Sequence, residues 1–246
     1  MEDQYQQIGV KYTAVKLKPS VAFTEVAAVL GMLGDLDGER VLDLACGAGF
    51  YTRLIRQRGA SHVLGVDLSQ TMIDVAQAEE AVHPLGVEYR VADAVHLPQY
   101  GAFDIVTAVW LLHYARTQED LTSMCRNIGR NLAPGGRLIA ILPNPEFINE
   151  QAETEFYGFR TQVLNPGEAI AHVRMDFLGQ EVFSIEYAQW PLTAYHDALA
   201  LAGFSAIENV PVGVSSQGVA QMGAAYWTIH RNNPLAMGLV ATFQGS

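Results

Sequence analysis

The segment VLDLACGAGFYTRLIRQRGASHVLGVD, residues 41–67, decides the fold. An apolar run leads into a turn with glycines at Gly47 and Gly49, and a second apolar run ends on Asp67. This order predicts strand, glycine turn, helix and strand, which is a βαβ unit. Glycines in such a turn let the backbone approach a ligand because no Cβ intervenes. An acid after the second strand can accept both hydroxyls of a ribose, so we expect a nucleoside to bind here.

Two positions in this segment indicate which nucleoside is bound. A dinucleotide fingerprint has a third glycine three residues after the second, but Thr52 stands there, and no arginine adjoins Asp67 to bind a 2′-phosphate. Asp43 is an acid within an apolar strand, where it needs a positive or hydrogen-bonding partner. S-adenosylmethionine offers a ribose, an ammonium group and a sulfonium in place of a phosphate. The pattern therefore favours this cofactor over NAD.

Several motifs resemble one known family. DLACGAGFYT, residues 43–52, is similar to the first motif of class I S-adenosylmethionine-dependent methyltransferases, and VLGVDLSQTMIDVA, residues 63–76, is similar to the segment that follows it. LAPGGRLI, residues 132–139, and YHDALALAGF, residues 195–204, resemble later segments of the same family. The resemblance implies an α/β fold: a Rossmann-like, seven-stranded, mostly parallel, doubly wound sheet with an antiparallel hairpin and an inserted substrate cap.

The resemblance also implies a set of cofactor-binding residues. They are Tyr12 near the N-terminus, Asp43, Ala45, Gly47 and Gly49 around the glycine turn, Asp67, Leu68 and Met72 after the second strand, Asp93 and Ala94 after the third, and Trp110 after the fourth. The alternatives are that Met72 only packs in the core and that Asp93 only caps a turn. The bound cofactor would leave as S-adenosylhomocysteine.

The opening of the chain resembles one branch of this family. Tyr5, Gly9 and Tyr12 are spaced as in small-molecule methyltransferases whose N-terminal segment folds over the cofactor and acceptor as a lid, although an ordinary amphipathic start is the alternative. Together with Glu25 and the glycine turn, this opening is most similar to the branch that includes the toxoflavin N-methyltransferase of bacterial azapteridine biosynthesis. That likeness covers residues 5 to about 145 and leaves the acceptor open.

Candidate acceptor-binding residues come from the segment after the fourth strand, from the N-terminal segment and from the cap. Residues 110–114 (WLLHY) follow the fourth strand, at the edge where open α/β sheets bind ligands. His113 is the candidate general base, because its ordinary pKa suits a proton acceptor near neutrality; the alternative is that it positions a ligand or only packs. Aromatic side chains would form a wall for a planar acceptor, and basic ones in the cap would meet an acidic or carbonyl-bearing acceptor. These candidates are Tyr5, Tyr157, Tyr187 and Trp190, with His172 and Arg174 as the basic residues; the alternative for the two basic residues is that they are solvated surface.

Periodicity predicts the remaining elements and four regions. Helices are expected over 20–34 with Ser20 as N-cap, 70–81, 118–132 and 193–202, and strands over 87–92, 103–109 and 138–142, within 177–190, and over 226–229 as the closing strand. The regions are an N-terminal lid with helices (1–34), a cofactor-binding core (35–142), a substrate-binding cap (143–192) and a C-terminal completion of the core sheet (193–246).

Composition excludes several classes of function. The net charge of −11, with 15 Lys and Arg, disfavours binding to nucleic acid. No apolar run reaches the roughly 18 residues that cross a bilayer, and the polar N-terminus is not a signal peptide. Two cysteines make neither a disulfide framework nor a zinc site. We expect a cytoplasmic monomer or homodimer with no metal and no membrane association.

Methyl transfer from a sulfonium needs positioning more than chemical assistance. The donor is already activated, so the protein must align donor and acceptor and exclude water, which agrees with the absence of a catalytic triad or an HxxxH metal pair. We expect methylation of a small planar aromatic or heterocyclic metabolite, with nitrogen favoured. The alternatives are O- or C-methylation, a macromolecular acceptor, a reaction without methyl transfer, and an NAD-dependent oxidoreductase.

Overall fold

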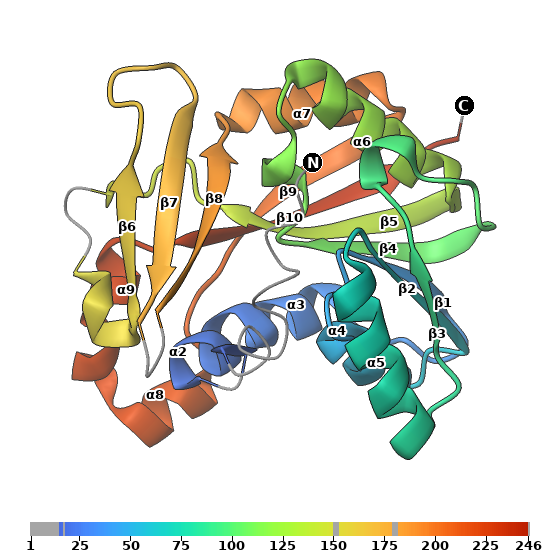
Figure 1. Cartoon of the computed structure of the whole chain (residues 1–246), viewed down its shortest axis with the longest axis horizontal. Helices are drawn as coiled ribbons and strands as arrows, with labels where there is room; N and C mark the ends of the chain where they lie inside the picture. Colours follow the sequence, from blue (N-terminus) through green and yellow to red (C-terminus); the bar gives the residue numbers. More distant parts are fainter. Residues whose placement is uncertain (1–14, 17, 150–152, 179–181, 246) are drawn as a thin grey trace.

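The computed structural model describes residues 15–16, 18–149, 153–178 and 182–245 and contains one large sheet. Its seven strands have the order β3-β2-β1-β4-β5-β10-β9 (Figure 1). β10 runs antiparallel to both of its neighbours, whereas the other neighbouring strands are parallel. The strands are β1 (Arg40–Leu44), β2 (His62–Asp67), β3 (Glu88–Val91), β4 (Phe103–Val109), β5 (Leu132–Pro143), β9 (Phe204–Pro211) and β10 (Ala236–Phe243). This confirms the Rossmann-like sheet.

Helices cover both faces of the large sheet. One face packs against α3 (Ala27–Leu33), α4 (Phe50–Gln57) and α5 (Gln70–Val82), and the other against α6 (Gln118–Arg130) and α7 (Leu192–Leu201). The central strand contributes to both cores, since Val41 packs with the first group of helices and Leu42 with the second. Strands buried on two faces are apolar along their whole length, which explains the continuous apolar runs in the sequence.

A second, antiparallel sheet lies between β5 and α7 in the chain. It has the order β6-β7-β8, with β6 (Phe159–Val163), β7 (Ala171–Phe177) and β8 (Phe183–Gln189), and stands beside the large sheet (Figure 1). Val173, Met175 and Phe177 on β7 are buried, whereas the alternating residues His172 and Arg174 are exposed. β7 therefore has one buried face and one exposed face.

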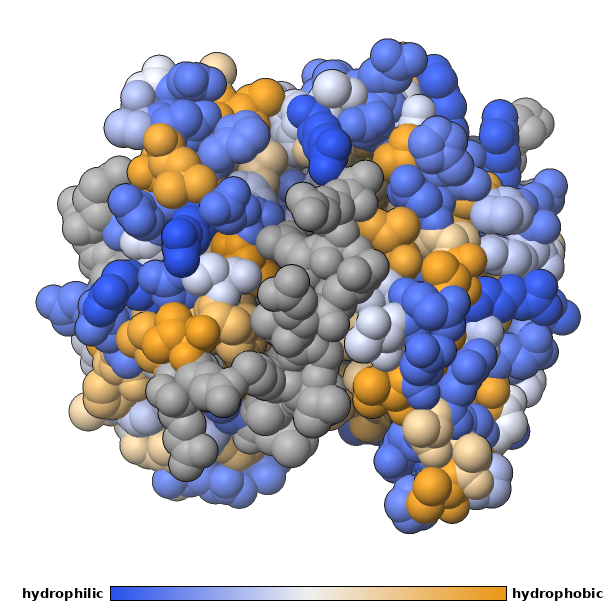
Figure 2. Space-filling view, viewed as in Figure 1, coloured by the Kyte–Doolittle hydropathy of each residue, from blue (hydrophilic) through white to orange (hydrophobic). Residues whose placement is uncertain are grey.

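Short helices complete the structure around these sheets. They are α2 (Pro19–Val21), the π-helical turn η1 (Ala22–Val26), η2 (Ala94–His96), η3 (Leu112–Tyr114), η5 (Thr154–Tyr157), α8 (Ser216–Met222), η6 (Ala224–Trp227) and α9 (Thr228–Asn232). None of the helices in the described part of the chain has the length and apolar character needed to span a bilayer. On the face shown in Figure 2, apolar side chains form separate groups among polar ones, as on ordinary protein surfaces.

Two sequence predictions about elements are wrong. Ser20 is not an N-cap, because α2 already begins at Pro19, and the Ser20 carbonyl instead accepts a hydrogen bond from the Thr24 hydroxyl at 2.5 Å. Residues 226–229 are not the closing strand, because Trp227 is fully buried in helical structure and its Nε1 donates to the Gly218 carbonyl at 3.0 Å. The closing strand is β10, ten residues further along the chain.

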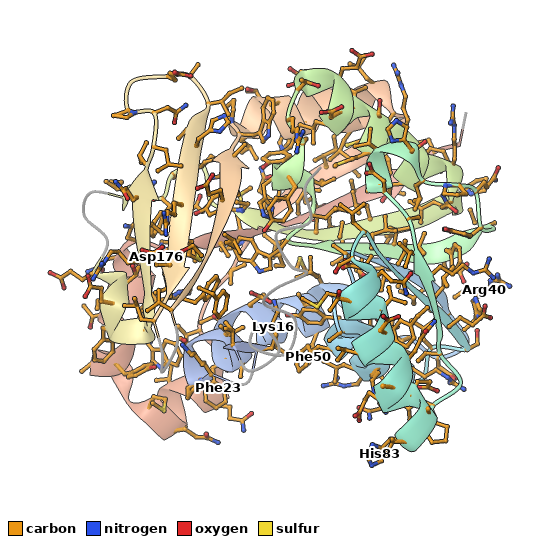
Figure 3. The ribbon with its side chains drawn as sticks, viewed as in Figure 1. Lys16, Phe23, Arg40, Phe50, His83 and Asp176 are labelled. Atoms are coloured by element: carbon orange, nitrogen blue, oxygen red, sulfur yellow. The ribbon has the colours of Figure 1, made fainter. Side chains whose placement is uncertain are left out.

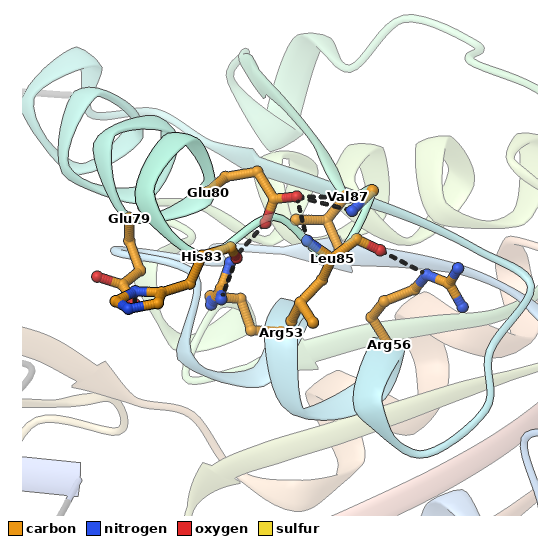
Figure 4. A network of polar contacts seen from close by, with 8 residues as sticks. Arg53, Arg56, Glu79, Glu80, His83, Leu85 and Val87 are labelled. Carbon is orange, nitrogen blue, oxygen red and sulfur yellow. Dashed lines mark hydrogen bonds and ion pairs between the residues drawn. The ribbon is translucent and has the colours of Figure 1, made fainter.

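A polar network fixes α4, the helix that follows the glycine turn. Arg53 on α4 donates from Nη1 to Glu80 Oε2 on α5 at 2.5 Å, and Glu80 Oε1 accepts the backbone N–H groups of Leu85 and Gly86 at 2.6 and 2.7 Å (Figure 4). Arg56 donates from Nε to the Leu85 carbonyl at 3.0 Å. The loop before β3 is thereby tied to both helices, and the start of α4 has a fixed position beside the sheet.

Candidate functional site

The glycine turn between β1 and α4 has a left-handed backbone at three positions. Ala45, Gly47 and Gly49 have φ values of 55°, 54° and 84°. A Cβ at Gly49 would lie 2.4 Å from Tyr89 Oη, so a glycine is needed there for close approach. A Cβ at Gly47 would meet no heavy atom within 4 Å. The turn therefore packs tightly against β3 on one side and leaves open space at Gly47, where a bound molecule can approach the backbone.

Asp67 lies beside this turn at the carboxyl end of β2. Its Oδ2 accepts the Gly47 N–H at 2.8 Å and its Oδ1 accepts the Ser69 N–H at 2.9 Å. Ser69 caps α5 as predicted, because its Oγ accepts the N–H of Met72 at 3.3 Å. The Asp67 carboxylate is thus held between the glycine turn and the first turn of α5, next to Leu68. This position fits a ribose, and the contact itself stays a prediction.

The acid in β1 has hydrogen-bonding partners instead of a cation. Asp43 is buried, and its two carboxylate oxygens accept hydrogen bonds from Thr107 and Thr52, each at 2.7 Å. Burial raises the pKa of Asp43 to about 6, the two threonine hydroxyls oppose this rise, and the charge of Asp67 adds to it. Thr52, which departs from the dinucleotide fingerprint, therefore supports the acid beneath the glycine turn.

The acid in the turn after β3 caps the short helix that follows it. Asp93 Oδ1 accepts the Val95 N–H at 2.9 Å and caps η2, which begins at Ala94. Its Oδ2 lies 3.5 Å from His96 Nδ1. Capping is therefore one role of Asp93, and a contact with adenine stays a prediction. Met72 is almost fully buried at the start of α5, as in the alternative that it packs in the core.

A buried carboxylate joins three segments at the end of β4. Glu25, in η1, accepts hydrogen bonds from the Tyr51 hydroxyl at 2.7 Å and from Trp110 Nε1 at 2.6 Å, and forms an ion pair with Lys16. Trp110 follows β4 with a left-handed φ of 56°. Glu25 is absent from the site residues that the sequence predicts, although an acid on an apolar helical face, here in a π-helical turn, is a signal for a functional position.

A pocket opens between these segments and the antiparallel sheet. Its empty volume is about 610 Å³, a value that includes the part open to solvent. Lys16, labelled in Figure 3 near Phe50 of α4, is one of the residues that line it. The lining is largely aromatic and aliphatic and consists of Val15, Lys16, Lys18, Ser20, Val21, Glu25, Trp110, His113, Tyr114, Tyr157, Gly158, Phe159, Met175, Phe177, Ile185, Tyr187 and Leu235.

His113 borders this pocket without a hydrogen-bonding partner. Both of its ring nitrogens are buried and unpaired with respect to the residues that the structure describes. Its ring lies 4.2 Å from that of Tyr114, 5.4 Å from that of Tyr187 and 5.6 Å from that of Trp110, between centroids. Burial lowers the pKa of His113 to about 3. The expectation of a base with an ordinary pKa is therefore wrong, and the imidazole is neutral at physiological pH.

The predicted acceptor-binding residues divide into two groups. Tyr157 and Tyr187 line the pocket, and the Tyr157 hydroxyl donates to the Tyr226 carbonyl at 2.6 Å. Tyr5 and Tyr12 lie outside the described residues. His113, Tyr157 and Tyr187 are thus brought together around one cavity.

Arg174 and Trp190 do not reach the pocket, and their prediction as acceptor-binding residues is corrected. Arg174 lies on the exposed face of β7, where it donates to Asp176 at 2.9 Å and to Ser184 at 3.0 Å (Asp176 is labelled in Figure 3). Trp190 is buried in the core with α6 and α7, and its Nε1 donates to the Ala115 carbonyl at 3.2 Å. Arg174 alternates on β7 with Met175 and Phe177, which line the pocket, and Trp190 follows the end of β8.

Comparisons with known proteins agree with this geometry. A family model described as a methyltransferase domain matches residues 41–136. The chain is 31% identical over 175 residues to N-demethylindolmycin N-methyltransferase of Streptomyces griseus, covering 70% of this chain and 72% of that protein. It is 37% identical over 121 residues to demethylmenaquinone methyltransferase of Lactococcus lactis. That match covers 47% of this chain and 46%, about half, of the relative. An S-adenosylmethionine-dependent methyltransferase structure from Mesorhizobium loti superposes with a TM-score of 0.65 at 23% identity, over 93% of this chain and 99% of that one.

Proposed function

Because the chain belongs to the S-adenosylmethionine-dependent methyltransferases, we propose that it methylates a small planar aromatic or heterocyclic metabolite. The observation that carries the proposal is the pocket: an aromatic and aliphatic cavity that meets the carboxyl end of β4 at Trp110 and His113. Flat aromatic walls suit a flat apolar acceptor.

The cofactor is S-adenosylmethionine, and its bound form supplies the methyl group already activated on a sulfonium. We assign the ribose to Asp67 and the approach of the methionine portion to the open side of the turn at Gly47. Leu68, Met72, Asp93 and Ala94 would surround the adenine. Ala45 and Asp43 support the turn from below, and Trp110 would separate the donor from the acceptor. Among the described residues, Asp67 thus offers carboxylate oxygens that can accept hydrogen bonds from the ribose hydroxyls.

Within the pocket, the protein would act by orientation and by exclusion of water. In-line transfer needs the donor carbon and the acceptor atom about 3 Å apart in a line, and most of the rate gain follows from that alignment. A neutral His113 can donate one hydrogen bond and accept another, so it would hold an N–H or carbonyl group of the acceptor instead of removing a proton. The regions 1–34 and 143–192 would close over the acceptor as lid and cap.

Nitrogen is the favoured acceptor atom. The relative from Streptomyces griseus is by name an N-methyltransferase of a small molecule, and the opening of the chain resembles the branch with toxoflavin N-methyltransferase. O- or C-methylation in secondary metabolism is the alternative, as is a reaction that uses the fold without methyl transfer. Product analysis by mass spectrometry, which counts added methyl groups, separates these possibilities.

The test begins with calorimetric titration of the protein with S-adenosylhomocysteine, NAD and NADP. We expect binding of the first alone, and a loss of about tenfold or more in Asp67→Ala, because a carboxylate that accepts hydroxyl hydrogen bonds is removed. Asp104→Ala is the matched control, since Asp104 lies at the amino end of β4, where its Oδ2 accepts the Arg40 N–H at 2.9 Å. Equal affinity of Asp67→Ala and the parent protein would refute the site, and binding of a nicotinamide cofactor would refute the function. An acceptor screen with planar heterocycles follows.

A further inference from the structure

Among the described residues, one positive charge that lines the pocket has no balancing carboxylate. Lys16 and Lys18 both line the pocket, but Lys16 forms an ion pair with Glu25. For Lys18, no described residue provides a carboxylate within ion-pair distance, and its Nζ has the Leu178 carbonyl as a hydrogen-bond acceptor at 3.4 Å. The charges of Lys16 and Glu25 cancel and His113 is neutral, so the described lining has a net charge of one positive unit, which Lys18 carries.

The backbone beside Lys18 makes room for its ammonium group. Gly158 ends η5 with a left-handed φ of 86°, and a Cβ there would lie 2.8 Å from Lys18 Nζ and 3.9 Å from its Cε. The side chain therefore lies against the turn that leads into β6 and is half-buried, instead of extending into solvent. An ammonium held at an apolar wall loses hydration that a bound anion can replace.

The distribution of lysines in the sequence supports a special role for this segment. The chain has three lysines, Lys11, Lys16 and Lys18, all within eight residues, and the twelve other cationic side chains are arginines. The whole chain carries a net charge of −11, which repels anions in general. An acidic acceptor would therefore need a local cation, and the pocket has one.

Resting on the proposed methyltransferase function, we propose that the acceptor carries an acidic oxygen, as a carboxylate or an enolate, and that Lys18 binds it. The planar ring then lies along the wall of Tyr157 and Tyr187, and the acidic group fixes which edge of the ring faces Trp110. The basic residues that the sequence predicts for this task, His172 and Arg174, are on the exposed face of the cap. In this proposal Lys18, from the N-terminal part of the chain, supplies the positive charge that the sequence assigned to those two residues.

The experiment compares a bicyclic acid with its uncharged amide. Quinoline-2-carboxylate and quinoline-2-carboxamide are titrated into the full chain saturated with S-adenosylhomocysteine, for the parent protein, Lys18→Met and Arg174→Met. We expect the parent to bind the acid about tenfold more tightly than the amide, since hydrogen bonds to charged groups in sheltered sites have this strength. Lys18→Met loses the preference and keeps the affinity for the amide, whereas Arg174→Met keeps the preference.

A second measurement guards against a structural effect of the substitution. Acetylation of Lys18, followed by mass spectrometry, should slow in the presence of the acid and not of the amide. If S-adenosylhomocysteine binds but the acid binds no better than the amide, or Lys18→Met keeps the preference, the inference is wrong and the proposed function stands. If S-adenosylhomocysteine does not bind the parent protein, the proposed function itself fails, which is a distinguishable result.

Discussion

The buried acid in β1 gives a prediction that can be worked through from the structure. The pKa of Asp43 is about 6 in the folded protein against an ordinary value of 3.8, with burial as the main cause. The folded state therefore binds the proton more tightly than the unfolded state, so stability falls as pH rises from about 4 to 6. A shift of about two pKa units, each worth about 1.4 kcal/mol, corresponds to a loss of about 3 kcal/mol.

Asp43→Asn removes this titration while keeping the shape of the side chain. Above about pH 7 the variant should be more stable than the parent protein, by about 1–3 kcal/mol once the poorer fit to one threonine hydroxyl is subtracted. Near pH 4 the advantage should vanish, because the parent acid is then protonated in the folded state too. Subtracting the two stabilities at each pH isolates Asp43 from the other titrating groups.

Urea unfolding followed by far-ultraviolet circular dichroism, at several pH values between about 4 and 7.5, measures both free energies of unfolding. Asp104→Asn, at the amino end of the neighbouring strand, is the control for the loss of a carboxylate that is only half-buried. A difference between Asp43→Asn and parent that stays constant across the range would refute the reasoning, because Asp43 would then keep an ordinary pKa despite its burial.

Two further predictions concern the support of the site. Glu25→Gln should lower the free energy of unfolding by about 3 kcal/mol, because the substitution breaks the buried ion pair between Lys16 and Glu25. A loss of less than about 1 kcal/mol, measured by urea unfolding, would contradict a buried ion pair. Gly49→Ala should lower the free energy of unfolding by about 1–3 kcal/mol in a thermal melt, because the position has a φ of 84° and a Cβ would meet Tyr89. Gly213→Ala, where a Cβ meets no atom within 4 Å, is the control and should leave the stability unchanged. Equal melting temperatures of the two variants would contradict the clash.

Much of the fold follows from local patterns that agree with one another. The turn at Gly47 and Gly49 between two apolar runs predicts β1, α4 and β2, and Ser69 correctly marks the start of α5. These elements are predictable because their turn chemistry, capping and periodicity point to the same structure. The acid Asp67 and the acid Asp43 also fall beside the glycine turn, where the pattern places them.

The errors have a common cause in tertiary packing. Residues 226–229 have high strand propensity, but Trp227 is drawn into a buried helical turn, whereas β10 is rich in small residues and is buried on both faces. Arg174 is on the side of β7 that faces away from the pocket, which the alternation within β7 could have shown, whereas Trp190 follows β8 and packs in the core with α6 and α7. The partnership of Glu25 with Trp110 joins residues 85 positions apart, and no local pattern encodes it.

The antiparallel sheet has a consequence for how the family can diversify. Its three strands form one uninterrupted piece of chain between β5 and α7, and the match to the methyltransferase family model ends at residue 136, before this piece begins. Tyr187 and Met175, which face the pocket, are therefore encoded apart from the glycine turn and Asp67. A single recombination event that replaces this piece would exchange one wall of the pocket and leave the glycine turn and Asp67 in place, so the pocket can change without rebuilding the rest of the fold.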